Sequence, residues 1–166
     1  MAKSKKLIFK IRKLGPEDKK WVKNFIIKHW GAEKVISRRK VYYPEKLAGF
    51  LAVKNKKHLG LITYNINGNS CEIITINSTI RRKGIGTALI KAVQKVAKAS
   101  HCRRLWFITT NDNLYGLWFW QKRGFLLKAV HPNAIAFSRK LKPQIPKIGN
   151  FGIPIRDEIE LEKIIK

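Results

Sequence analysis

Apolar and polar residues alternate at the start of this chain and then change to a helical spacing. Residues 7–14 alternate as in a β-strand. The segment 15–18, Gly-Pro-Glu-Asp, carries the proline and the acidic residues typical of a first helical turn. Apolar residues then recur at helical spacing over 22–29, and Gly31 can end the helix. We therefore predict a strand followed by one helix.

The next part of the chain has the pattern of several consecutive strands. Residues 50–53, 59–66 and 71–77 are apolar and partly β-branched, and turn residues separate them. These three runs predict an antiparallel meander. The preceding segment, 32–48, is less regular, and we interpret it as a loop or a broken helix near a cleft.

From residue 87 onward, helical and strand patterns follow one another. The pattern predicts helices over 87–99 and 113–122 and strands over 104–110, 125–130 and 155–162. A run of strands followed by alternating helices and strands indicates an α/β or α+β fold with a mixed, mostly antiparallel central sheet flanked by helices. We expect one domain over residues 1–166, with residues 1–6 as a disordered basic tail.

The charge of the chain is strongly positive. The 166 residues include 36 Lys and Arg against 10 Asp and Glu, a formal net charge of +26. A field of this strength attracts nucleic acid, anionic membranes and anionic cofactors. The lysines are scattered rather than grouped, which favours solvated surface charge over a dedicated groove for a polyanion.

Other features limit the class of protein. No apolar run is long enough to cross a membrane, and the basic N-terminus is not followed by the apolar core of a signal peptide. Cys71 and Cys102 have no metal-ligand spacing around them, so we expect buried thiols and no metal site. These features predict a cytoplasmic protein without a membrane partner.

The segment 78–90, STIRRKGIGTALI, combines three basic side chains with two glycines at a predicted helix start. The first N–H groups of a helix have no internal partner, and the helix dipole adds partial positive charge there. Glycine lets an oxygen atom approach the backbone closely. This turn therefore predicts a binding site for a phosphate group, with a surface turn of no function as the alternative.

Two common nucleotide-binding motifs do not fit this turn. A P-loop requires Gly-x-x-x-x-Gly-Lys-Ser/Thr, which is absent from the sequence. A dinucleotide-binding turn requires a third glycine where this chain has Leu89, and no acidic residue follows about 20 positions later.

Together with a second segment, the turn resembles a known family. Residues 81–86, Arg-Arg-Lys-Gly-Ile-Gly, resemble the Arg/Gln-x-x-Gly-x-Gly/Ala motif of the GCN5-related N-acetyltransferases. Residues 111–125, NDNLYGLWFWQKRGF, resemble the segment of that family in which an asparagine precedes a helix that ends in Gly-Phe. Both motifs occur in the family's order, and the C-terminal tail resembles a bacterial branch of it. The likeness covers most of residues 7–162 and implies an acetyl-CoA-dependent N-acetyltransferase with the fold of that family.

The resemblance also implies where acetyl-CoA binds. The pyrophosphate would lie on the glycine turn and the pantetheine arm between two splayed strands. The cofactor-binding residues implied by the family motif, or placed along the arm, are Ile74, Ile76, Arg81, Arg82, Lys83, Gly84, Ile85, Gly86, Thr87, Asn113 and Trp120.

The acetyl transfer itself requires a base, because an alkylammonium has a pKa of about 10.4 and must lose a proton before it attacks. Glu72 is the only acidic residue between Glu45 and Asp112. Period-two alternation would place Glu72 on the same strand face as Ile74 and Ile76. We predict that Glu72 is the catalytic base, with an edge carboxylate paired to a lysine as the alternative. A backbone N–H near Ile76 would meet the developing oxyanion.

The sequence departs from the family at the position of its usual general acid. That tyrosine is replaced by Trp120, whose indole N–H does not transfer a proton at ordinary pH. One explanation is that the thiolate leaves with only the help of water, because a thiol pKa is about 8.5. Tyr115, five residues earlier, is a second candidate acid, and loss of activity is a third explanation.

The function predicted from the sequence is therefore N-acetylation of a small-molecule or peptide amine by direct attack in a ternary complex. The alternative is a basic RNA- or ribosome-binding module on the same fold with weak or no catalysis. The acidic residues Asp157, Glu158, Glu160 and Glu162 could attract a cationic substrate, but we expect them to neutralise nearby lysines.

Overall fold

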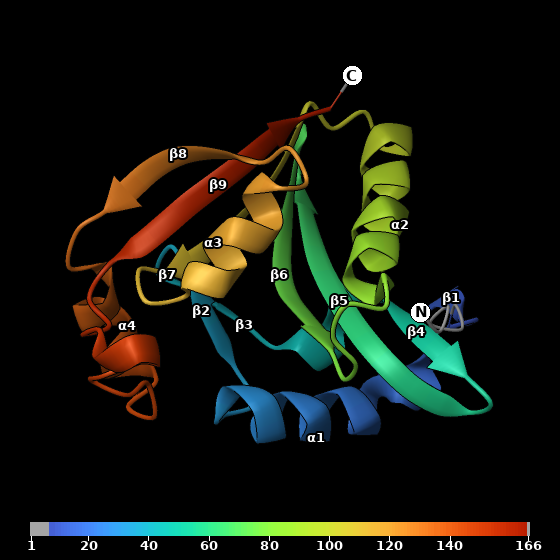
Figure 1. Ribbon diagram of the computed structural model, residues 1–166, viewed down its shortest axis with the longest axis horizontal. Helices are drawn as coiled ribbons and strands as arrows, with labels where there is room; N and C mark the ends of the chain where they lie inside the picture. The colour runs from blue at the N-terminus through green and yellow to red at the C-terminus, as the bar shows by residue number, and fades with distance from the viewer. Residues whose placement is uncertain (1–6, 166) are drawn as a thin grey trace, which may run out of the picture.

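The computed structural model describes residues 7–165, and the predicted basic tail 1–6 lies outside them. A seven-stranded mixed sheet runs through the molecule in the order β1-β4-β5-β6-β7-β9-β8, and a separate hairpin is formed by β2 and β3 (Figure 1). The strands are β1 Lys10–Lys13, β2 Val35–Ser37, β3 Lys40–Tyr42, β4 Ala48–Lys54, β5 Lys57–Asn67, β6 Ser70–Ser78, β7 Arg104–Thr110, β8 Leu126–His131 and β9 Glu158–Ile164.

Four α-helices accompany the sheet. They are α1 Lys19–Trp30, α2 Ile85–Ala99, α3 Leu114–Gln121 and α4 Ala134–Leu141. Three short 3-10 turns also occur, η1 Pro16–Asp18, η2 Pro44–Lys46 and η3 Asn150–Gly152. None of the helices in the described part of the chain is long and apolar enough to cross a membrane.

The pairing of the strands confirms the predicted mixed, mostly antiparallel sheet. Strands β1, β4, β5 and β6 form the predicted antiparallel meander, with β1 added at its edge. Among the strands of residues 7–165, only β6 and β7 pair in parallel, because α2 connects them as a crossover. Strand β9 then pairs antiparallel with both β7 and β8.

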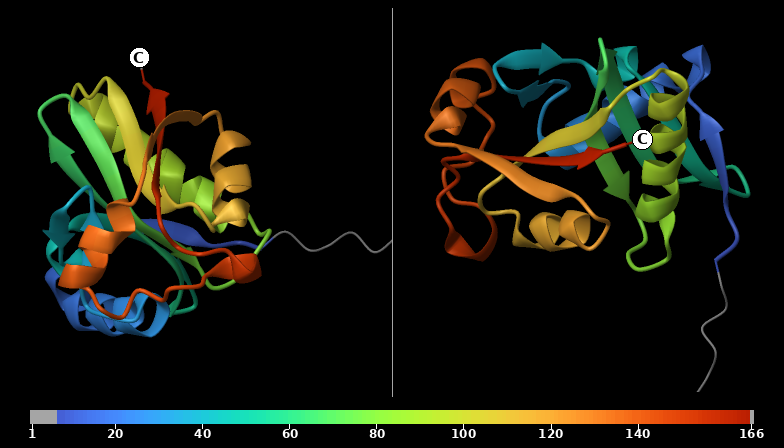
Figure 2. Two further views of the ribbon diagram at one scale, coloured as in Figure 1. Left: turned by 90° about the vertical axis from the view of Figure 1, so that its left-hand side faces the viewer. Right: turned by 90° about the horizontal axis from the view of Figure 1, so that it is seen from above.

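The two faces of the sheet carry separate apolar cores. Figure 2 shows the ribbon of the sheet and its helices from two further directions. One core joins the sheet to α2 and α3 through residues such as Leu89, Val93 and Phe125. The other joins it to α1 and the β2–β3 hairpin through residues such as Phe25, Ile26 and Val35. The apolar stripe of α1 faces this second core, as predicted. Helix α1 ends at Gly31, whose φ of 77° is left-handed.

Two elements differ from the sequence prediction. The segment 32–48 is not a loop or a broken helix, because it contains the antiparallel hairpin of β2 and β3. Its turn consists of Arg38 and Arg39 with φ values of 46° and 66°. The usual Asn-Gly signal of such a turn is missing, so the sequence gives no hairpin signature. The second difference is α4, a helix of eight residues in the tail that the sequence pattern did not indicate.

Candidate active site

The candidate site lies where two neighbouring strands separate. Strands β6 and β7 pair from Ser70 opposite Arg104 to Ile73 opposite Phe107. Beyond this point β6 continues to Ser78 and β7 to Thr110 without pairing to each other. Backbone groups on the facing edges are therefore available to an extended ligand. The separation predicted from the sequence is present.

The glycine turn stands at the open end of this gap, at the start of α2 (Figure 1). Gly84 is the N-cap residue with a φ of 78°, and Arg82 is also left-handed, with a φ of 57°. No side chain caps the helix start. The first amides of α2, in Ile85, Gly86 and Thr87, are therefore left for an external acceptor, in the field of the helix dipole.

A cavity of about 290 Å³ opens between the turn and α3. It is lined by Ile76, Asn77, Ser78, Ile80, Arg81, Arg82, Lys83, Gly84, Ile85, Gly86, Thr87, Asn113, Tyr115, Gly116, Trp118, Phe119, Trp120 and Arg123. The cavity therefore gathers nearly all residues predicted for the cofactor, from three separate segments of the chain. The exception among them is Ile74, and Glu72, the predicted base, does not line the cavity either.

The chemistry of this cavity fits acetyl-CoA. One end is a cationic turn with uncapped helix amides, which suits a pyrophosphate. The other end is a slot between separated strands, floored by Ile76 and the aromatic residues of α3, which suits the long pantetheine arm. At Gly86 a Cβ atom would lie 2.9 Å from Phe119, so a glycine lets the start of α2 and α3 approach each other at the cavity floor.

Ile76 and Glu72 lie on opposite faces of β6, which corrects the prediction from strand alternation. The pairing of β5 with β6 shifts by one residue, because Thr63 pairs with Thr75 whereas Tyr64 pairs with Ile73. This β-bulge turns the later side chains over, so that Ile76 packs with the α2 core while Ile74 belongs to the α1 core. The expectation that Glu72, Ile74 and Ile76 share one face is wrong for this reason.

Glu72 is buried below the β2–β3 hairpin, with 5% of its surface exposed. Ser37 donates a hydrogen bond of 2.5 Å to Oε1, and the Tyr42 hydroxyl donates one of 2.9 Å to Oε2. Burial raises the pKa of Glu72 above its ordinary value, although the two hydroxyl donors oppose this shift. Glu72 is thus a carboxylate with a raised pKa and two hydroxyl donors. No lysine among residues 7–165 forms the ion pair with it that the alternative interpretation required.

Asn113 has a structural role in addition to lining the cavity. Its Oδ1 accepts a hydrogen bond of 3.0 Å from the Gly116 amide and so caps α3. Its Nδ2 donates to Thr109 at the end of β7, at 2.8 Å. Asn113 therefore fixes the position of α3 against the separated strand.

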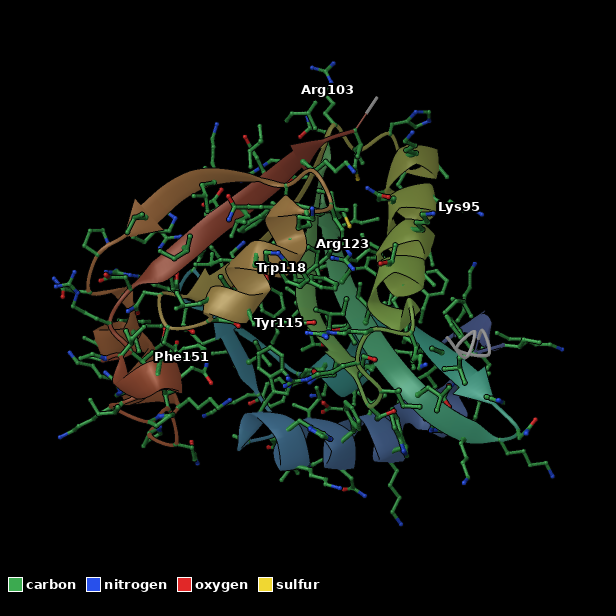
Figure 3. The ribbon with its side chains drawn as sticks, viewed as in Figure 1. Lys95, Arg103, Tyr115, Trp118, Arg123 and Phe151 are labelled. Carbon is green, nitrogen blue, oxygen red and sulfur yellow. The ribbon has the colours of Figure 1, made fainter. Side chains whose placement is uncertain are left out.

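The two residues considered for the general acid occupy different surroundings. Trp120 is 4% exposed and packs against Phe107, with ring centroids 4.0 Å apart. No residue in the described part of the chain accepts a hydrogen bond from its indole N–H. Tyr115 is 45% exposed at the rim, where the Arg81 guanidinium lies 5.5 Å from its ring centroid. Figure 3 shows Tyr115 and Trp118 along α3.

Arg123 is a further residue of this site that the sequence analysis missed. Its Nε and Nη2 donate hydrogen bonds of 3.0 and 2.9 Å to the Thr87 hydroxyl, and its Nη1 donates to the Phe119 carbonyl at 2.7 Å. The guanidinium thus connects the end of α3 to the start of α2 across the cavity (Figure 3). The sequence around Arg123 does not indicate this role, because Arg123 and Thr87 lie 36 residues apart in the chain.

The acidic residues of the tail form ion pairs with basic side chains of the same chain. Glu158 is buried and pairs with Arg38 at 3.2 Å, and Glu160 accepts from Arg104 and His131. Glu162 pairs with Arg104 and Lys128, and Asp157 pairs with Arg156. The partners of this group are mainly arginines, so in the described part of the chain the expectation of neutralised lysines holds only for Lys128, which pairs with Glu162. Within residues 7–165, no group of three His, Cys, Asp or Glu residues is arranged to hold a metal ion.

Comparison with known proteins identifies the class to which this fold and site belong. The sequence pattern of the acetyltransferase (GNAT) family matches residues 16–125. The chain belongs to this family.

A relative from Bacillus subtilis, the uncharacterized protein YdhI, is 46% identical over 143 residues, covering 86% of this chain and 89% of YdhI. Solved structures of the same fold include a B. subtilis acetyltransferase in complex with CoA, with a TM-score of 0.69 and 18% identity over 96% of this chain and 100% of that one. They also include a GNAT family acetyltransferase from Elizabethkingia anophelis with acetyl-CoA bound, with a TM-score of 0.67 and 21% identity over 95% of this chain and 98% of that one.

Proposed function

We propose that this chain is a single-domain cytoplasmic N-acetyltransferase that transfers the acetyl group of acetyl-CoA to an amine by direct attack in a ternary complex. The observation that carries the proposal is the uncapped, basic glycine turn at the open end of the gap between β6 and β7. Two solved structures of the same fold hold CoA or acetyl-CoA, which supports the choice of ligand.

The glycine turn and strand β6 would bind different parts of acetyl-CoA. The amides of α2 from Ile85 to Thr87 would bind the pyrophosphate, and Arg81, Arg82 and Lys83 would add charge around it. The backbone of β6 near Ile74 and Ile76 would pair with the amides of the pantetheine arm. Acetyl-CoA supplies an activated thioester, whose carbonyl oxygen a backbone N–H near Ile76 would stabilise as negative charge develops.

Glu72 would accept the proton that the acceptor ammonium loses before the amine attacks. Because Ser37 and Tyr42 occupy its oxygen atoms, the proton would arrive through a hydroxyl group or through water. Tyr115 at the rim, or water, would supply a proton to the departing thiolate. The indole of Trp120 would line the channel without transferring a proton.

The direct test is release of free CoA thiol from acetyl-CoA in the presence of an amine panel. The panel contains a polyamine, an aminoglycoside, a small primary amine and a peptide with a free N-terminus. We expect one of these classes to accelerate thiol release above the rate of hydrolysis and to gain an acetyl group by mass. Thiol release that no amine accelerates, from protein that binds acetyl-CoA, would contradict the transferase assignment.

A further inference from the structure

Helix α2 carries exposed lysines in a part of the chain that contains no acidic residue. Between Glu72 and Asp112 the chain has eight Lys and Arg residues and no acidic residue. Helix α2 lies in this interval. Its exposed positions are Lys91, Lys95, Lys98 and the last residue, Ala99. The three lysines are separated by four and three residues, so they form one row along the outer face of the helix.

This lysine row, Lys91, Lys95 and Lys98, has no opposing charge. None of the three forms an ion pair with any residue from 7 to 165. The buried side of α2 packs into the core through Leu89, Val93 and other apolar residues, so the row cannot turn inward. Figure 3 shows Lys95 pointing away from the sheet.

The acidic residues cannot neutralise the row, because they are used elsewhere. Five of the ten are buried, namely Asp18, Glu72, Asp112, Asp157 and Glu158. Glu160 and Glu162 bind Arg104, and Glu33 binds Lys23 of α1. The other two, Glu17 and Glu45, lie in the turns η1 and η2 beside α1. Acidic residues therefore lie near α1, where Glu33 pairs with Lys23, whereas no residue from 7 to 165 forms an ion pair with a lysine of α2.

We propose that the lysine row on α2 is a docking surface for the phosphate backbone of double-stranded nucleic acid. The row spans about 10 Å at about 1.5 Å per residue, and a duplex carries one negative charge per about 1.7 Å of its axis. The complementary partner is thus a rigid array of closely spaced phosphates. Binding of this kind positions the protein without reading sequence.

The composition of the helix surface selects this partner over two other polyanions. A helix that lies in a membrane surface places large apolar side chains among its cations, and α2 exposes none. A single-stranded nucleic acid is held by aromatic side chains that stack on its bases, and the row contains none. Contact with the phosphate backbone of a duplex requires only cationic side chains such as those of the lysine row.

The experiment compares two matched triple variants of the full chain. The first carries Lys91→Gln, Lys95→Gln and Lys98→Gln, and the control carries Lys19→Gln, Lys20→Gln and Lys28→Gln on α1. Each triple removes three charges from exposed positions on a helix, so both variants have the same net charge. Unfolding temperature and acetyl-CoA affinity are measured first, and both should match the original protein.

Affinity for a short fluorescent DNA duplex is then measured across salt concentrations of about 50 to 200 mM. Loss of three phosphate contacts should make the slope of log affinity against log salt shallower by about 2.7, with at least a tenfold loss of affinity at the low-salt end. The α1 control should keep the original slope. Equal weakening of both variants, no weakening of either, or tighter binding to anionic vesicles or to a single strand would overturn the proposal.

Discussion

Replacing Glu72 by glutamine is expected to lower kcat by a factor of about 10² to 10⁴, the range in which a positioned base contributes. The affinity for acetyl-CoA should be unchanged, because Glu72 does not line the cofactor cavity. Glutamine is nearly isosteric and can still bond to Ser37 and Tyr42, so the fold should be retained. The measurement is steady-state turnover with the amine found in the panel, together with acetyl-CoA affinity.

The dependence of turnover on pH separates a base from a structural carboxylate. A base acts only when ionised, so activity should be lost as the pH falls through the pKa of Glu72, which burial raises above its ordinary value. The glutamine variant should lack this acidic limb. Ser37→Ala removes a donor that holds the pKa of Glu72 down, so it should move the limb to higher pH.

Glu160→Gln provides the matched control, because Glu160 is another partly buried carboxylate of the sheet, bonded to Arg104 and His131. It should leave the pH profile of turnover in place. Full turnover of the Glu72→Gln variant, or an unmoved acidic limb in Ser37→Ala, would show that Glu72 is not the base.

Replacing Gly86 by valine is expected to weaken acetyl-CoA binding by about 100-fold. A Cβ atom at this position would lie 2.9 Å from Phe119 and would place branched carbon atoms beside the first amides of α2. Two charge-assisted hydrogen bonds at about 1.5 kcal/mol each account for a loss of this size. The measurement is acetyl-CoA affinity by isothermal titration calorimetry.

A pair of milder variants separates crowding from blocked binding. In Gly86→Ala the new methyl group meets the ring of Phe119, and Phe119→Leu would make room for it. If crowding of α3 is the whole effect, the double variant should recover affinity. We expect it to recover both thermal stability and affinity, because the family motif accepts alanine at this position and the added methyl group meets Phe119 and Ile76, whereas the branched side chain of valine would still crowd the amides. Unchanged affinity in Gly86→Val would contradict the location of the phosphate site.

The part of this site that could be predicted from sequence is the part built from local segments. The glycine turn requires only a few consecutive residues and a helix start, and Asn113 caps the helix that directly follows it in the chain. Both are determined by contacts over a few residues. The order of strands likewise followed from apolar runs with turn residues between them.

The parts that could not be predicted depend on single-residue shifts or on distant contacts. The bulge in β6 reverses the side chains after Ile74, and period-two counting has no means of detecting one inserted residue. The Arg38–Arg39 turn has left-handed backbone without glycine or asparagine. Burial of Glu72 by Ser37 and Tyr42, 35 and 30 residues away, becomes visible only when the hairpin is placed.

The measurement that tests the account most directly is thermal unfolding of the protein with and without acetyl-CoA, in moderate salt. ATP and pyrophosphate serve as polyanion controls for a chain of net charge +26. Acetyl-CoA at about 100 times its dissociation constant should add about 2.7 kcal/mol to the free energy of unfolding, a rise of a few degrees in unfolding temperature. A shift that acetyl-CoA causes and the controls do not is the predicted result. Equal shifts with all three anions, or none with acetyl-CoA, would contradict the claim that the glycine turn binds this cofactor.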